Sequence, residues 1–207
     1  MNRSRYVQLL CVVAMLFASC GDREMSLNEY VESIDAIFDG AIARYETLVT
    51  SQEGLVLIVG QGAHLGLDDQ GMDLSDFTPE DLHEALEQVA DIQEEAVNRA
   101  AAIVPPAQLA ELHALYFREL PIAELAVRAG TATSWEDLSA SPEMAAYRTA
   151  LSADNQVCAE FQAKLDSTAE RGAFADTPWI PDQLKEIVEY GLGCDNLPAN
   201  PEDVYRP

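Results

Sequence analysis

Prolines at the starts of predicted helices constrain the fold of this chain more than any other feature of its sequence. Each is followed within three positions by at least one polar residue and then by an apolar one, as at Pro79, Pro106, Pro142 and Pro181. Proline suits the first turn of a helix because its missing N–H would have no partner there. The residues beyond the four prolines do not match one another, so the prolines mark helix starts rather than a sequence repeat.

Apolar residues recur at helical spacing between these starts. The pattern predicts helices over 27–50, 79–104, 106–129 with a kink at Pro121, and 142–171, followed by a short helix over 182–190. Ser26 and Glu29 form a capping-box pattern at the first helix, and Gly130 and Gly172 follow the third and fourth. We therefore expect an all-α fold, an antiparallel four-helix bundle whose short C-terminal helix is held by a disulfide.

The first twenty residues have the pattern of a secretory signal peptide. Arg3 and Arg5 precede an apolar run from Leu9 to Ala18, and small residues lead to Cys20. The run is about half as long as a membrane-spanning helix requires. An apolar leader that ends on a cysteine resembles the lipobox of bacterial lipoprotein precursors, and the resemblance covers only residues 1–20.

The lipoprotein resemblance implies that residues 1–19 are removed and that Cys20 carries the lipid. Residues 20–25 would then form a linker, and residues 26–207 a single domain on the outer face of a bacterial membrane. Gly21 lacks the aspartate that signals inner-membrane retention in many two-membrane bacteria, and the choice between inner and outer membrane stays open.

The charge of the chain excludes some partners. Without Arg3 and Arg5, ten basic residues remain against 36 acidic ones, a net charge of −26 with neutral histidines. Such a field repels nucleic acid and anionic headgroups, so membrane attachment would depend on the acyl chains.

Cysteine use points to one disulfide. Cys11 leaves with the leader and Cys20 takes the lipid, which leaves Cys158 and Cys194 as a pair in an exported chain. A thiolate metal site is the rival interpretation, but these cysteines lack a nearby histidine and the close spacing of a zinc site. We expect the bond to hold the C-terminal hairpin against the fourth helix, with Trp179 packed beneath it.

The segment from Gly54 to Gly66 is apolar and rich in glycine. A strand followed by glycines is typical of a dinucleotide-binding loop. Here the spacing of the glycines is one residue too long for that motif, and the chain shows no other strands to form its sheet. A buried loop or helix extension is favoured. A third interpretation is a lid or contact surface for a ligand or partner, formed by residues Leu55, Leu57, Ile58 and Leu65.

The three histidines define a candidate metal site. His64, His83 and His113 could bind zinc or copper if the fold brought them together. Glu80 and His83 also resemble half of a di-iron site, but the third helix does not supply the matching pair. We expect His83 to face solvent and His113 to lie at the margin of the core. No other cofactor is expected.

An acidic stretch over 68–76 lacks the glycine and glutamate of a helix-loop-helix calcium site, and the chain has no nucleophile motif, so we assign no catalytic residue. We expect a lipid-anchored binding or interaction module near the membrane surface, with an envelope protein or small ligand as partner. The alternatives are a metal-handling lipoprotein and an envelope enzyme.

Overall fold

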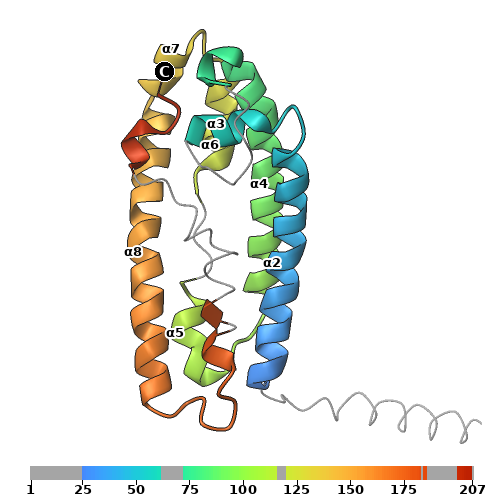
Figure 1. Ribbon diagram of the computed structural model, residues 1–207, viewed down its shortest axis with the longest axis vertical. Helices are drawn as coiled ribbons and strands as arrows, with labels where there is room; N and C mark the ends of the chain where they lie inside the picture. Colours follow the sequence, from blue (N-terminus) through green and yellow to red (C-terminus); the bar gives the residue numbers. More distant parts are fainter. Residues whose placement is uncertain (1–24, 62–71, 116–119, 183, 186–199, 207) are drawn as a thin grey trace, which may run out of the picture.

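The computed structural model describes residues 25–61, 72–115, 120–182, 184–185 and 200–206 (Figure 1). Within these residues all regular secondary structure is helical, which confirms the all-α class. None of the described helices is long and apolar enough to cross a membrane.

Three long helices begin where their caps predict. In α2 (Leu27–Val49), Ser26 and Glu29 form a complete capping box, and in α4 (Pro79–Ala101), Thr78 and Asp81 do the same. In α8 (Pro142–Glu170) the Ser141 hydroxyl accepts the Met144 N–H. Each cap satisfies amide groups that would otherwise have no partner, which fixes the helix start locally. The three helices end one to three residues earlier than predicted.

The third predicted helix is broken rather than kinked. A short 3₁₀ turn, η2 (Ala107–Leu109), leads into α5 (Ala110–His113), and a separate helix α6 (Ile122–Ala129) begins after Pro121. Proline lacks the N–H of a helix interior and disfavours helical geometry in the residue before it, so Pro121 starts a new helix as its N-cap. Ser134 then caps α7 (Trp135–Ser139).

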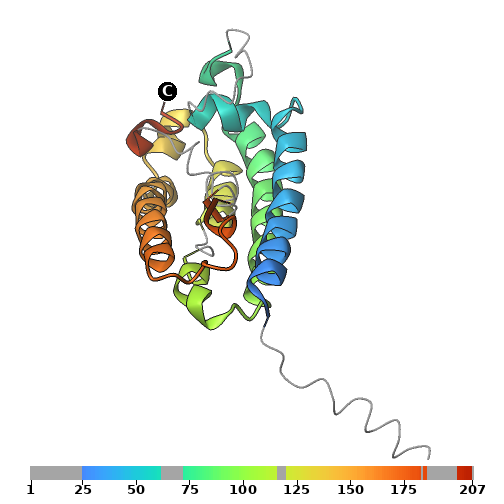
Figure 2. The same cartoon turned by 60° about the horizontal axis from the view of Figure 1, so that its bottom comes forward.

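The helices pack around two hydrophobic clusters at opposite ends of the body. Helix α2 runs antiparallel to α4, α4 packs against α6, and α8 stands on the far side (Figures 1 and 2). The upper cluster joins the end of α2 to the starts of α4 and α8, and contains Leu48, Val49, Val56, Leu57, Ile58, Leu82, Ala85, Leu86, Ile122, Leu125, Ala126, Ala129, Trp135, Leu138, Met144, Tyr147, Leu151, Val204 and Tyr205. The lower cluster contains Tyr30, Val31, Ile34, Phe38, Leu109, Leu112, Phe161, Leu165, Phe174, Ile180 and Leu184.

The chain after α8 contributes to both clusters. Gly172, with a φ of 77°, ends α8, and the Ala173 N–H donates back to the Thr168 carbonyl at 3.4 Å. Residues 180–182 and 184–185 are helical, whereas the remainder of the predicted helix over 182–190 lies outside the described residues. The 3₁₀ turn η4 (Pro201–Asp203) then lies at the opposite end of the body, beside the start of α8 (Figure 1).

Two expectations about the C-terminal region have different outcomes. Trp179 is 47% exposed, so it does not pack beneath the predicted disulfide. Cys158 is half-buried on α8, but Cys194 lies outside the described residues, and their bond stays a prediction.

Candidate functional site

The apolar segment that follows α2 forms a short helix, α3 (Leu55–Gln61), and not a strand. The turn before it is so tight that a Cβ on Gly54 would lie 2.0 Å from the Leu48 carbonyl oxygen. A turn over residues 50–54 separates this helix from α2, so the described part of the segment is neither a loop nor an extension of α2. It does not provide the strand on which a dinucleotide-binding loop depends.

The apolar side chains of α3 lie in the core. Leu57 and Ile58 are buried in the upper cluster, and Leu55 is half-buried. Leu65 lies outside the described residues. A partner or ligand would therefore reach Leu57 and Ile58 only if α3 moved.

The C-terminal segment docks directly against α3. The Tyr205 N–H donates to the Gly60 carbonyl at 2.6 Å, and a Cβ on Gly60 would lie 2.0 Å from Cε1 of the Tyr205 ring. That ring stacks on Trp135 with a centroid distance of 6.3 Å and an interplanar angle of 2°, and it also meets Tyr147 at 6.5 Å. Tyr205 is 0% exposed and forms part of the core. Glycine at position 60 is therefore required by the approach of the Tyr205 ring.

A buried guanidinium holds the preceding residue in place. Arg148 of α8 is 6% exposed and donates to the Val204 carbonyl from Nη2 at 2.6 Å and from Nε at 3.1 Å. It also donates to the Ser139 carbonyl and hydroxyl at 3.1 and 3.0 Å. These bonds compensate for part of the cost of burying a charge, and the same burial lowers the Arg148 pKa. We call Gly60, Trp135, Tyr147, Arg148 and Tyr205 the C-terminal clamp.

The clamp carries local strain and buried phenols. Tyr205 has a φ of 51°, in the left-handed region that side chains rarely adopt. Its Oη is buried without a hydrogen bond, although the nearby Gln61 side chain moderates the effect of burial on its pKa. Gln61 Nε2 donates to Tyr147 Oη at 3.3 Å. Burial raises the pKa of both tyrosines, so both phenols are neutral at ordinary pH.

His83 has a structural role at the upper end. It is expected to face solvent, but only 24% of its side-chain surface is exposed. A hydrogen bond of 2.9 Å joins its Nδ1 to the Ala126 carbonyl, and Nε2 lies 3.7 Å from a Glu87 carboxylate oxygen. A Cβ on Gly130 would lie 3.0 Å from Cγ of the His83 ring. His83 therefore packs α4 against the end of α6, and the glycine at position 130 permits this close approach.

His113 lies in α5 at the other end of the body, at the margin of the lower cluster as expected. A hydrogen bond of 3.0 Å joins its Nδ1 to Tyr30 Oη, and the two rings meet edge to face. Burial lowers the His113 pKa and raises that of Tyr30. The structure thus separates His83 from His113, and His64 lies outside the described residues. Among the described residues no group of three or more potential metal ligands gathers.

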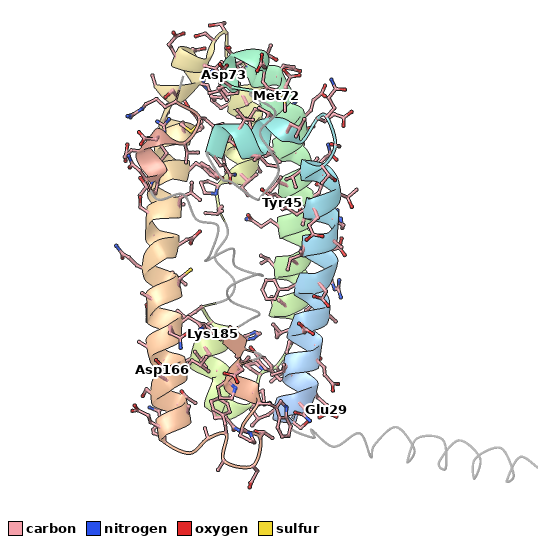
Figure 3. The ribbon with its side chains drawn as sticks, viewed as in Figure 1. Glu29, Tyr45, Met72, Asp73, Asp166 and Lys185 are labelled. Carbon is pink, nitrogen blue, oxygen red and sulfur yellow. The ribbon has the colours of Figure 1, made fainter. Side chains whose placement is uncertain are left out.

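The acidic stretch over 68–76 is described only from residue 72 onward. There Asp73 and Asp76 cap the 3₁₀ turn η1 (Leu74–Asp76), and the Ser75 hydroxyl donates to Asp73. This hydrogen bond lowers the Asp73 pKa. The described carboxylates of this stretch therefore serve the local turn at the upper end of the body (Figure 3).

Neither the helical periodicity nor the motifs of the sequence predict the clamp. One signal for it is present: Arg148 occupies the apolar stripe of its helix, between Met144 and Leu151. A charged residue in such a position requires polar partners from elsewhere in the chain. The partner segment, Val204 and Tyr205, is a second signal, because two large apolar residues stand in an otherwise polar C-terminus.

No family model matches this chain, and comparisons with curated proteins and with solved structures found no match either.

Proposed function

We propose that this protein is a bacterial lipoprotein, held on the outer face of a membrane by acyl chains on Cys20, and that its helical body is a binding or interaction module beside the bilayer. An envelope protein or a small ligand is its partner. No observation favours the metal-handling alternative, since His83 is bonded to Ala126 of the upper cluster and His113 to Tyr30 of the lower cluster.

The observation that carries this proposal is the short chain between Cys20 and the folded body. Met25 already packs against the lower cluster, and Ser26 caps α2. Five residues span at most about 18 Å when fully extended. Lipidation of Cys20 would hold the start of α2 within that distance of the membrane surface, where the body would meet other membrane-bound molecules.

The packing of the upper cluster favours a partner-binding site on the exposed surface of the protein rather than in its core. The apolar side chains of α3 are buried, and the space beside Gly60 is filled by the Tyr205 ring. A ligand that entered between these elements would have to displace core side chains, at a cost of several kcal/mol. We therefore place partner recognition on exposed positions rather than on Leu57 and Ile58.

Membrane fractionation tests the anchor. Cys20→Ser should move the protein from the membrane to the soluble fraction, and the N-terminal peptide of the unaltered protein should carry the mass of acyl chains. Cys11→Ser is the matched control, because it replaces a leader cysteine that processing removes. An unacylated N-terminus, or unchanged membrane association of Cys20→Ser, would refute the anchor.

Photo-cross-linking in intact membranes tests the interaction module. A photoreactive residue at the exposed Val127 should give a discrete adduct, whereas one at the buried Leu57 should give none. If neither Val127 nor other exposed positions along α2 and α4 give an adduct, the body has no stable protein partner.

We also propose that the body is an antiparallel four-helix bundle in which the short helices α5 and α6 share the third position. Both lie between α4 and α8, one near each end of the body (Figures 1 and 2). The break at Pro121 divides one helix position into two pieces without changing its place. An experimental structure that puts α5 or α6 outside this position would contradict the assignment.

The Cys158–Cys194 disulfide belongs to the same proposal. In the chain-entropy model, a bond that closes a loop of this length stabilises the fold by about 3 to 4 kcal/mol. Thiol titration of the denatured mature protein should detect no free sulfhydryl, and two free sulfhydryls would contradict the pairing.

A further inference from the structure

Three large apolar side chains of the described residues are exposed on the surface. Val104 is 79% exposed, Val127 is 67% exposed and Trp179 is 47% exposed. Val127 belongs to α6, which packs in the upper cluster. Val104 and Trp179, which we call the basal pair, belong to the other end.

The lower cluster ties the basal pair to the start of α2. Ile103, the neighbour of Val104, packs against that cluster, and Ile180, the neighbour of Trp179, is buried within it. The first turn of α2 contributes Tyr30 to the same cluster. The loop after α8 lies at the end of the body where α2 begins (Figure 1). The basal pair is therefore carried by segments fixed to the point where the chain from Cys20 enters the body.

The loop around Trp179 is ordered by its own hydrogen bonds. The Thr177 N–H donates to the Phe174 carbonyl at 2.9 Å, and the Ile180 N–H donates to the Thr177 carbonyl at 3.1 Å. Phe174 and Ile180 are buried on either side of this turn. The indole is thus held at the surface by two buried neighbours.

The length of the chain before α2 fixes which end can meet a membrane. A lipid on Cys20 would lie within about 18 Å of Met25. Helix α8, with 29 residues, is about 43 Å long, so the upper end lies much farther from the attachment point. We infer that the basal pair inserts into the headgroup region of the bilayer, so that the protein rests on the membrane by this end. This inference rests on the proposed lipidation of Cys20.

The chemistry of the basal pair suits a lipid surface. Tryptophan is enriched at membrane interfaces because its ring is apolar and its indole N–H remains hydrogen-bonded to water or headgroups. The same end carries the carboxylates Glu29 and Asp166 together with the ammonium of Lys185 (Figure 3). The ammonium of Lys164 is paired with Glu111 at 3.1 Å, and the Arg171 guanidinium donates to Ser167 Oγ at 2.7 Å. Because carboxylates are repelled by anionic headgroups, the membrane surface that this end fits is a zwitterionic one.

Tryptophan quenching tests the inference on the lipidated protein, because the chain has only two tryptophans, Trp135 and Trp179. The acylated protein is reconstituted into phosphatidylcholine vesicles whose acyl chains carry bromine, a short-range quencher, at the carbons next to the headgroups. The Trp135→Phe variant reports on Trp179 alone, and Trp179→Phe reports on Trp135, which is buried at the far end. Trp179 emission should shift to shorter wavelength and be quenched, whereas Trp135 emission should stay unchanged.

Two substitutions provide a matched control. Val104→Asp should reduce the quenching of Trp179, because a carboxylate at this position resists insertion, whereas Val127→Asp at the other end should leave it unchanged. Unquenched Trp179 in a protein with acyl chains on Cys20 overturns the inference and leaves the anchor intact. A Trp179 emission shift without quenching shows that protein covers the indole and also overturns it. If Cys20 carries no acyl chain, the proposed anchor fails and this inference fails with it.

Discussion

A methyl group added at Gly60 tests the packing of the C-terminal clamp. In Gly60→Ala the new Cβ would lie 2.0 Å from Cε1 and 2.1 Å from Cδ1 of Tyr205, far inside van der Waals contact. The ring cannot simply rotate away, because Trp135 stacks on it and Tyr147 borders it. We expect the ring to shift and to lose part of these contacts.

The expected change in the free energy of unfolding for Gly60→Ala is the sum of three contributions. Overpacking of a filled core costs about 1 to 3 kcal/mol, and loss of an aromatic pair costs about 1 kcal/mol more. Alanine favours the helix over glycine by about 1 kcal/mol, which offsets part of that cost. Gly60→Ala should therefore lower the free energy of unfolding by about 2 kcal/mol.

A double-mutant cycle separates the clash from other effects. Tyr205→Ala alone should cost about 3 to 5 kcal/mol, as expected for removal of a buried aromatic ring. In that background Gly60→Ala should change sign and stabilise by about 1 kcal/mol, because only the helix preference remains. The assay is urea denaturation followed by circular dichroism, with Trp135 fluorescence as a local probe in a Trp179→Phe background.

Gly40→Ala is the matched control within the same protein. Gly40 is an exposed glycine of α2, and a Cβ there would meet Arg99 Nη1 at an ordinary 3.7 Å. This variant should gain about 1 kcal/mol whether or not Tyr205 is present. If Gly60→Ala behaves like Gly40→Ala in the presence of Tyr205, the ring does not occupy the space beside α3, and the packing of the clamp is refuted.

Three further changes are tested by urea denaturation, one in the clamp and two elsewhere in the fold. Arg148→Met leaves the Val204 and Ser139 carbonyls without their donor and should lower the free energy of unfolding by about 3 kcal/mol. A decrease of less than a few tenths of a kcal/mol would show that the guanidinium contributes little to stability. Gly172→Ala meets no atom within 4 Å, so its cost of about 1 kcal/mol should come from the positive φ alone. Burial lowers the His113 pKa, so the unfolded chain binds the proton first and stability should fall as pH drops below about 6.5. His113→Gln should weaken this fall, and an unchanged pH profile would contradict it.

Local signals account for the parts of the fold that can be predicted from the sequence. Ser26, Thr78 and Ser141 cap helices through bonds to residues three positions away, so a short window contains all the information. The sequence predicts a kink at Pro121 and not the observed break, because the apolar periodicity continues on both sides and sequence spacing does not measure how far a helix bends.

The C-terminal clamp cannot be predicted in the same way. Gly60 and Tyr205 are 145 positions apart in the sequence, and their contact depends on the packing of α3, α7 and α8. In the sequence, the glycine at position 60 resembles part of a phosphate-binding loop, whereas in the structure it admits an aromatic ring. Similarly, the expectation that Trp179 packs beneath a disulfide is wrong, because sequence pattern does not distinguish a core indole from an exposed one.

The chain after α8 links the two ends of the body, and this arrangement makes the clamp and the basal pair separately testable. Phe174 and Ile180 fix the loop of Trp179 in the lower cluster, whereas Tyr205 belongs to the upper cluster. Release of Tyr205 by Gly60→Ala should therefore leave Trp179 in place, because its buried neighbours lie at the other end of the body. At urea concentrations where the variant remains folded, quenching of Trp179 by brominated lipid should match that of the parent protein. A loss of quenching in folded Gly60→Ala would mean that the two clusters are coupled, and that the C-terminal clamp controls how the protein rests on the membrane.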